Sequence, residues 1–477
     1  MGLSKTRKNL ILLVACLEAF MSTLDGSIVN IALPDISEQM HVHISEVQWV
    51  TTAYLLTIVL LLLLWGKLAD IRGKKPVLII GFVLFAVGSA MCSMSHSLSF
   101  LVFSRIIQAF GASSMMSLSQ GIITSTFEPG ERGFALGQVG MMVGLGSLAG
   151  PFLGGVLVNA FSWPSIFLIN IPIAIFGAVM AFFVMPAHEE TSKLISFDGK
   201  GTAFYSAAML VLFLTLLLAQ QGILPAIWLI PAVVIAVLCL WGFVHTERHS
   251  PDPLIHMHLF RKMPFTLGLM QGFFIFIALS ATLMFMPFYL QDVLKYGPLH
   301  AGIIIAVYPI VMAIFSPISG RLADRMSTRP LTALGTGLSA AALILLAFTH
   351  VNTPIWVTVV GLAVLGLGNG LFQSPNNTDI FNSVPLSQLG IAGGINALFR
   401  NIGFVAGTSF SVLIFSFTAG LDVNSISGNM DNNAFMQGFA WVFVFCGICS
   451  VIAFLLCFMR VMKKGTPSDA PDSIKEQ

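Results

Sequence analysis

Two acidic residues interrupt a long apolar run near the start of the chain. Glu18 and Asp25 lie within residues 10–32, which are otherwise mostly apolar, and Ser22 lies between them. In a helix the spacing i, i+4, i+7 places the three side chains on one face over roughly 10 Å. A carboxyl group in such a setting binds a proton in one environment and releases it in another, because loss of water favours the neutral acid. The pattern indicates proton binding and release.

An arginine in another apolar run is the natural counter-ion. Arg105 lies within residues 98–124, and Gln108 follows three positions later on nearly the same helix face. If Arg105 approaches a deprotonated carboxyl group it stabilises the charge, and a rearrangement that separates them favours proton uptake. A permanent pair that holds two helices in register is the alternative. We predict that Asp25, Glu18 and Arg105 couple proton binding to a conformational change. The alternative is that Asp25 is solvated or caps backbone groups near the outer end of its span, while Glu18 pairs with another helix.

The composition shows what must position these residues. Of 477 residues, 56% are hydrophobic and only 9% are charged, against about 25% charged in soluble domains. Runs of 18 or more apolar residues recur, and each can cross a hydrocarbon layer of about 30 Å as a helix. The runs are too long and too uniformly apolar for barrel strands, so an all-α polytopic membrane protein is predicted. The fourteen expected spans are residues 10–32, 47–69, 76–95, 98–124, 134–159, 165–185, 201–220, 226–245, 265–290, 300–322, 330–349, 354–376, 388–417 and 435–460.

The basic residues predict the orientation of these spans. Arg105 and Arg400 lie within spans and Lys295 lies in a loop on one side, whereas the other 20 of the 23 Lys and Arg lie at the termini or on the opposite side. By the positive-inside rule both termini are expected in the cytoplasm. Residues 422–433, which carry acids and no bases, are then an extracellular turn. The net charge of +2 gives no indication of nucleic-acid binding.

An internal repeat predicts two related halves. The sequence GKLAD at 66–70 is matched by GRLAD at 320–324, and GSLAG at 146–150 is matched by GFVAG at 403–407, at offsets of 254 and 257 residues. Two six-helix bundles with two inserted helices explain both offsets. The predicted units are an N-terminal bundle (1–187), two additional helices (188–250), a C-terminal bundle (251–464) and a cytoplasmic tail (465–477).

Four stretches resemble the motifs of a known family. They are LDGSIVNIALP (24–34), GKLADIRGKK (66–75), LVFSRIIQAFGAS (101–113) and GLGSLAGPFLGG (144–155). Together they resemble the fourteen-helix drug:proton antiporter family of the major facilitator superfamily. The second stretch departs from the family pattern, because Ile71 follows Asp70 where an arginine is usual and Arg72 comes one place later.

The resemblance implies roles for several residues. A charge-and-hydrogen-bond latch at the cytoplasmic face would include Gly66, Asp70, Arg72, Gly73 and Asp324; a solvated loop cluster is the alternative. The antiporter motif would include Gly146, Gly150, Pro151, Gly154 and Gly155, and we expect it to form a tight, movable contact between the halves; ordinary close packing is the alternative. Candidate substrate-binding residues are Asn30, Tyr54, Gln108, Asn396 and Arg400. For Arg400, which could bind an anionic group, a structural ion pair is the simpler interpretation.

The predicted function is proton-coupled export of hydrophobic, cationic drugs by alternating access. Its partners would be protons, a small-molecule substrate and the bilayer of the cell membrane, without nucleic acid, and the protein would act as a monomer. Export of one endogenous amphiphile is the alternative within transport, and a receptor or an enzyme is the alternative outside it. We expect no enzyme, because no nucleophile-and-base set and no nucleotide-binding GxxxxGK(S/T) motif occurs.

No cofactor or metal is expected either. Four histidines lie within fourteen residues, but Pro251 and Pro253 interrupt their spacing and no cysteine or carboxylate set completes a site. All six cysteines lie in apolar runs, which does not fit a disulfide framework.

Overall fold

The chain folds into long helices that run between two ends of one bundle. The computed structural model describes residues 4–186, 198–220, 226–250, 252–419 and 432–459. The first ten helices are α1 (Lys5–Met40), α2 (Ile44–Val47), α3 (Trp49–Arg72), α4 (Lys74–Ser93), α5 (Leu98–Thr126), α6 (Arg132–Phe161), α7 (Ser165–Leu168), α8 (Asn170–Val184), α9 (Gly199–Gln220) and α10 (Leu229–His249). They are followed by α11 (Met263–Phe288), α12 (Pro298–Arg325), α13 (Thr328–Ala347), α14 (Ile355–Asn382), α15 (Leu389–Ala419) and α16 (Asn432–Met459).

Fourteen helical segments of the described chain are long and apolar enough to cross a membrane, which confirms the predicted all-α class. The first span is longer than expected at both ends. It begins at Lys5, where the Ser4 side chain accepts a hydrogen bond from the backbone N–H of Arg7, and it ends at His41, whose φ of 54° stops the helix. Pro34 does not end it, because the helix continues to Met40. The expected tail at 465–477 and most of the turn at 422–433 lie outside the described residues.

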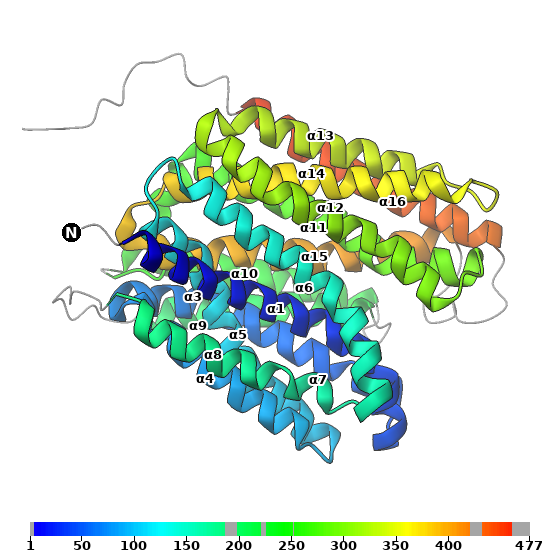
Figure 1. The fold of residues 1–477 in the computed structure, drawn as a ribbon, viewed down its shortest axis with the longest axis horizontal. Helices are drawn as coiled ribbons and strands as arrows, with labels where there is room; N and C mark the ends of the chain where they lie inside the picture. The colour runs from blue at the N-terminus through cyan, green and yellow to red at the C-terminus, as the bar shows by residue number, and fades with distance from the viewer. Residues whose placement is uncertain (1–3, 187–197, 221–225, 251, 420–431, 460–477) are drawn as a thin grey trace, which may run out of the picture.

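Two groups of helices are visible in Figure 1. α1, α3, α4, α5, α6 and α8 pack with one another, and α11 to α16 form the second group. The groups meet along two seams, α6 against α12 and α3 against α15. We call them the N-terminal and C-terminal halves.

The halves approach most closely at one end, which we call the basic end. It contains the start of α1, the α3–α4 turn, the end of α12 and the start of α15. A Cβ atom on Gly66 would lie 2.6 Å from the carbonyl oxygen of Gly390, and one on Gly137 would lie 2.6 Å from that of Ser316. Figure 1 shows the helices converging on the side where the N-terminus lies and diverging toward the opposite end. Along α6 and α12 the close contact continues to the middle of both helices, where a Cβ on Gly144 would lie 2.9 Å from the carbonyl oxygen of Pro309. Beyond it the helices diverge toward the opposite end, which we call the open end.

The helix pair α9–α10 lies beside the α3–α15 seam. Tyr205 of α9 is buried and its hydroxyl donates to the carbonyl of Val59 on α3 at 2.6 Å. Ser409 of α15 donates to the carbonyl of Leu216 on α9 at 3.4 Å. One inserted helix therefore contacts both halves.

Candidate functional site

Asp25 is fully enclosed by protein. Its side chain is 0% exposed, and Oδ2 accepts a hydrogen bond from Arg105 Nη1 at 2.8 Å. Oδ1 accepts two more, from Gln108 Nε2 at 2.9 Å and from Asn170 Nδ2 at 3.0 Å. A carboxyl group that accepts three hydrogen bonds, one from a cation, is arranged for the ionised form. Asp25 is therefore not a solvated group at a helix end.

Arg105 is held from several sides. Its Nε donates to the carbonyl of Val50 at 3.3 Å, and its guanidinium group also donates to Oε1 of Gln108. The guanidinium carbon lies 3.8 Å from the centre of the Tyr54 ring. Because α5 supplies Arg105 and Gln108 three residues apart, both reach Asp25 on α1 from one helix face, as the spacing predicts. The positive and negative charges of this pair balance within the N-terminal half.

Glu18 lies two helical turns from Asp25 in a different setting. It is 1% exposed, near the middle of α1, with Ser119 of α5 beside it. Within the described part of the chain its Oε2 has no hydrogen-bond partner and no cation pairs with it. A charged carboxylate is costly in such a place, whereas a neutral acid is tolerated. The two acids of α1 thus differ in their partners: Asp25 is paired with a cation, and Glu18 has none among the described residues.

Asp70 forms the first of two contacts that join the halves at the basic end. It lies near the end of α3, and its two oxygens accept hydrogen bonds from the backbone N–H groups of Gly390 (2.7 Å) and Ile391 (2.9 Å). These groups belong to the first turn of α15, where backbone donors lack partners in their own helix. A carboxylate at a helix N-terminus is also stabilised by the helix dipole.

Asp324 forms the second contact, in which the acid belongs to the C-terminal half and the backbone donors belong to the N-terminal half. From the end of α12 it accepts hydrogen bonds from the N–H groups of Gly133 (2.7 Å) and Phe134 (2.8 Å) in the first turn of α6. Each half thus caps a helix of the other. We call these four hydrogen bonds the basic-end latch.

Of the other expected latch residues, Gly66 and Gly73 contribute to the contact and the turn at the basic end, whereas Arg72 lies at the surface. Gly66 provides the close approach to Gly390, and Gly73, with a φ of 92°, forms the turn between α3 and α4. Arg72 is exposed, whereas Lys74 reaches across to α5 and donates to the carbonyl of Gly121 at 3.3 Å. In this conformation Lys74, rather than Arg72, links the turn to the bundle.

The expected position of the antiporter-motif glycines is wrong. Gly146, Gly150 and Gly154 of α6 face α1 of the same half, not the C-terminal half; a Cβ on Gly146 would lie 2.7 Å from the carbonyl oxygen of Phe20. Gly155 has open space at its Cβ position, and Pro151 is exposed. A stripe of small residues predicts a close approach but not the partner helix. The contact between halves uses other glycines of α6, namely Gly133, Gly137, Gly140 and Gly144.

This packing gives a prediction with an internal control. A Cβ on Gly150 would collide with the side chain of Ser27 on α1, whereas a Cβ on Gly155 would meet nothing within 4 Å. We expect Gly150→Ala to destabilise the protein by about 1–3 kcal/mol through overpacking. Gly155→Ala should be neutral or slightly stabilising, because alanine favours helix. Thermal unfolding in detergent measures both; equal melting temperatures for the two variants would contradict the packing described here.

Asn396 and Arg400 lie on one face of α15. Asn396 Nδ2 donates to Gln120 Oε1 of α5 at 2.6 Å and lies 3.3 Å from Oδ1 of Asn377 on α14, so it joins the halves. Arg400, one turn farther from the basic end, is partly exposed, and its guanidinium carbon lies 4.6 Å from the Phe276 ring centre. The predicted ion pair of Arg400 with an acid is not found among the described residues.

Comparison with known proteins gives the family. The family model of the Major Facilitator Superfamily matches residues 15–408, which is most of the chain. The protein belongs to the major facilitator superfamily. It is therefore a secondary transporter of the multi-pass membrane class and not an enzyme.

Relatives within the superfamily handle different compounds. The riboflavin transporter RibZ of Clostridioides difficile is 36% identical over 406 residues, covering 85% of this chain and 87% of that protein. The multidrug transporter protein MdtP of Bacillus subtilis is 28% identical over 427 residues, covering 89% and 77%. The tetracenomycin C resistance and export protein of Streptomyces glaucescens is 29% identical over 401 residues, covering 83% and 74%.

A solved superfamily structure shares the fold. The proton:xylose symporter XylE superposes with a TM-score of 0.69 at 14% identity, covering 96% of this chain and 97% of that one. At this identity the likeness concerns the fold alone.

The remaining predicted substrate-binding residues lie in two different settings. Tyr54 is buried beneath Arg105, and Gln108 belongs to the Asp25 cluster, so in this conformation both contact the ion pair. Asn30 is exposed, and its amide donates to the carbonyl of Gly26 in its own helix at 3.4 Å.

Several polar neighbours were not predicted from the sequence. Asn170 and Ser89 lie in the Asp25 cluster, the latter accepting from Gln108 Nε2 at 2.9 Å, and Gln120 and Asn377 surround Asn396. A lone uncharged polar residue in an apolar span has no spacing signal. The pair Asn376-Asn377, within a run of polar residues in one span, was a usable signal for α14.

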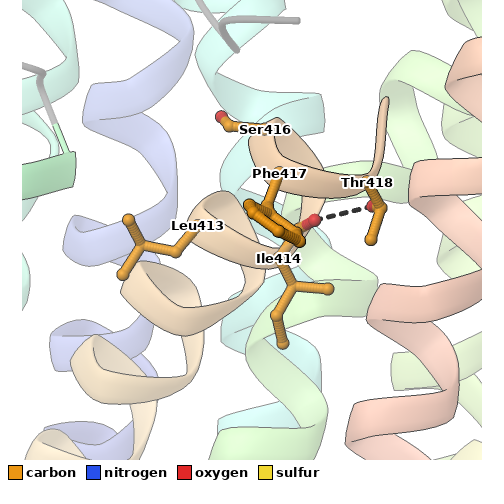
Figure 2. A pocket seen from close by; sticks show the side chains of 5 residues that line it. All are labelled: Leu413, Ile414, Ser416, Phe417 and Thr418. Atoms are coloured by element: carbon orange, nitrogen blue, oxygen red, sulfur yellow. Dashed lines mark hydrogen bonds between the residues drawn. The ribbon is translucent and has the colours of Figure 1, made fainter. Parts of the chain in front are cut away.

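A pocket near the end of α15 is unsuited to proton binding. Figure 2 shows its lining residues, Leu413, Ile414, Ser416, Phe417 and Thr418. None of them is ionisable, and the Thr418 hydroxyl donates to the carbonyl of Ile414 at 2.6 Å within the same helix. The candidate functional groups are therefore the polar residues inside the bundle: Glu18 and Asp25 on α1 and Arg400 on α15.

Proposed function

We propose that the protein is a proton-coupled exporter of hydrophobic compounds that works by alternating access as a monomer in the cell membrane. The observation that carries the proposal is the pair of unlike acids on α1. Glu18 is buried without a cation among the described residues, and Asp25 is buried against Arg105. Ionisable groups inside a membrane are functional by default, because they are costly to keep there.

The positive-inside rule supports a direction for this cycle. The basic end would face the cytoplasm, with both termini on that side, so the latched conformation would be open to the outside. In this conformation Glu18 is buried, and it would hold a proton that it took up from the outside. After the latch opens and the opposite end closes, Glu18 would lose its proton to the cytoplasm, and the protein would take up substrate there.

Asp25 and Arg105 would respond to the same change. Rearrangement of α1 against α5 would alter the hydrogen bonds of Asp25 and allow its protonation to follow the conformation. A permanent structural pair is the alternative, and in that case Glu18 alone would carry the proton.

Two observations bear on the substrate. Several relatives are multidrug or antibiotic exporters, which supports export of varied hydrophobic compounds, and 40 Phe and 23 Met supply adaptable apolar surface. Cationic compounds would be accepted by Glu18 when it is ionised. One relative is named for the transport of a single compound, riboflavin, and this supports a specific substrate, as in the second candidate, export of one endogenous amphiphile.

Transport into inside-out proteoliposomes tests the proposal. With an imposed pH gradient, acid inside, we expect several unrelated hydrophobic compounds to accumulate and a protonophore to abolish their accumulation. Accumulation of a single compound class would favour the second candidate. Accumulation that is unaffected by the pH gradient would contradict proton coupling.

A further inference from the structure

Arg400 lies in the first half of α15, on the helix face that carries Asn396. α15 packs its first turns against the N-terminal half: a Cβ on Gly394 would lie 2.6 Å from the carbonyl oxygen of Leu62 on α3. Two residues later Asn396 bonds to Gln120 across the seam. Arg400 follows at i+4 on the same face, about 6 Å farther from the latched end. The described hydrogen bonds between α15 and the N-terminal half stop at Asn396, one turn before Arg400.

The guanidinium group of Arg400 has aromatic neighbours but no anion. Its carbon atom lies 4.6 Å from the centre of the Phe276 ring on α11, and Tyr308 of α12 is near enough for an electrostatic interaction. Among the residues that the structure describes, none forms an ion pair or a hydrogen bond with this group. The residue is partly exposed within a membrane span, and its guanidinium group has five N–H donors.

Arg105 of the N-terminal half has the oxygen acceptors that Arg400 lacks among the described residues. Arg105 is 1% exposed and has a carboxylate, an amide oxygen, a backbone carbonyl and an aromatic ring around it. Arg400 has the aromatic ring without the three oxygen acceptors. A cation at membrane depth lacks its full set of partners until something supplies oxygen atoms, and a planar guanidinium group is suited to two-point binding of an anionic oxygen pair.

We propose that Arg400 binds a negatively charged oxygen group of the substrate, and that the substrates include aromatic compounds with a carboxylate or an equivalent anionic group. The aromatic part would lie against Phe276 and Tyr308, and the amide of Asn396 lies one turn below to accept or donate a further hydrogen bond. This rests on the proposed export function for its purpose, but the binding site itself does not depend on proton coupling. It extends the expected preference for cations to compounds that carry an anionic oxygen.

Two xanthene dyes of similar shape and opposite charge test the assignment. Fluorescein carries a free carboxylate, whereas in the ethyl ester of a rhodamine this group is esterified and the amino groups of the xanthene carry a positive charge. Fluorescence anisotropy with the detergent-solubilised full chain gives the dissociation constant of each dye. We expect Arg400→Gln to raise the dissociation constant of fluorescein about tenfold or more, with that of the rhodamine ester changed less than about twofold. Arg400→Lys should recover part of the fluorescein affinity, because the charge remains and the two-point geometry is lost.

Asn401→Ala is the matched control. Asn401 is the next residue on α15, and its amide donates to the carbonyl of Ala397 in the same helix at 2.8 Å. This variant should bind both dyes as the parent does, and retained rhodamine binding by Arg400→Gln shows that the variant is folded. Equal losses for both dyes, unchanged fluorescein binding in Arg400→Gln, or no fluorescein binding by the parent would each overturn the proposal. Arg400-dependent binding without gradient-driven transport would instead contradict proton coupling alone.

Discussion

Replacing Asp25 by Asn should abolish gradient-driven transport and destabilise the protein by about 3–5 kcal/mol. The variant leaves Arg105 charged, fully buried and without its carboxylate, since Asp25 is the acid that pairs with it at 2.8 Å. Asparagine also presents an N–H₂ group to Gln108 and Asn170, both of which donate to Asp25 in the parent. Thermal unfolding and proteoliposome transport measure the two effects.

The double variant Asp25→Asn with Arg105→Gln separates structure from coupling. Removing both charges of a buried pair is often neutral, whereas removing one is not. We expect the double variant to regain much of the lost stability but not the gradient-driven transport. Recovery of both would mean that the pair only holds α1 and α5 together, and proton coupling would then rest on Glu18.

The second large effect should come from the basic-end latch. Each of Asp70 and Asp324 accepts two backbone hydrogen bonds from the other half, at 2.7–2.9 Å. A hydrogen bond to a charged group contributes about 1.5–3 kcal/mol, and reversing a 99:1 equilibrium takes about 5.5 kcal/mol. The double variant Asp70→Ala with Asp324→Ala should therefore change the predominant conformation, and either single variant should have a partial effect.

Electron spin resonance distances can follow this change. Met94 and Phe348 are each 69% exposed and lie at the opposite end of different halves, so labels at Met94→Cys and Phe348→Cys report the opening there. Cys239→Ser removes the one native cysteine that is not buried. The label distance should shorten when both latch acids are replaced.

Asp379→Ala is the control for the latch variants. Asp379 lies at the basic end of α14 and accepts a hydrogen bond from Thr328 of its own half at 2.7 Å. Its replacement should leave the distance distribution between the labels as it is in the parent. If the latch variant and this control gave the same distribution, the four hydrogen bonds would not determine the conformation.

The sequence predicted the features that depend on charge and on repetition. Arg105 and Asp25 are opposite charges in separate apolar runs. An unpaired charge inside a membrane is costly, so the two side chains are expected to pair. The repeat at 66–70 and 320–324 predicted equivalent roles for Asp70 and Asp324. It did not predict their partners, because these are backbone N–H groups at the starts of α15 and α6, and backbone donors occur at every helix start.

Features that depend on which helices are neighbours could not be predicted from the sequence. Gly146 and Gly150 form a stripe that any helix could approach, and only the fold decides that α1 does so. Asn170 was missed because one amide among apolar residues has no pattern. For Arg400 an ion pair was expected, but which acid lies near enough is decided by the packing of α11, α12 and α15.

Glu18→Gln provides the most direct test of the claim that a buried acid of α1 couples proton flow to export. Two transport modes should be compared in proteoliposomes: accumulation driven by a pH gradient, and exchange of substrate for substrate without a gradient. Glutamine keeps the shape of Glu18 and mimics the neutral acid, so exchange of an uncharged substrate, which does not need the charge of Glu18, should continue while its gradient-driven accumulation is lost. Accumulation by the variant at the rate of the parent, under the same gradient, would contradict the account.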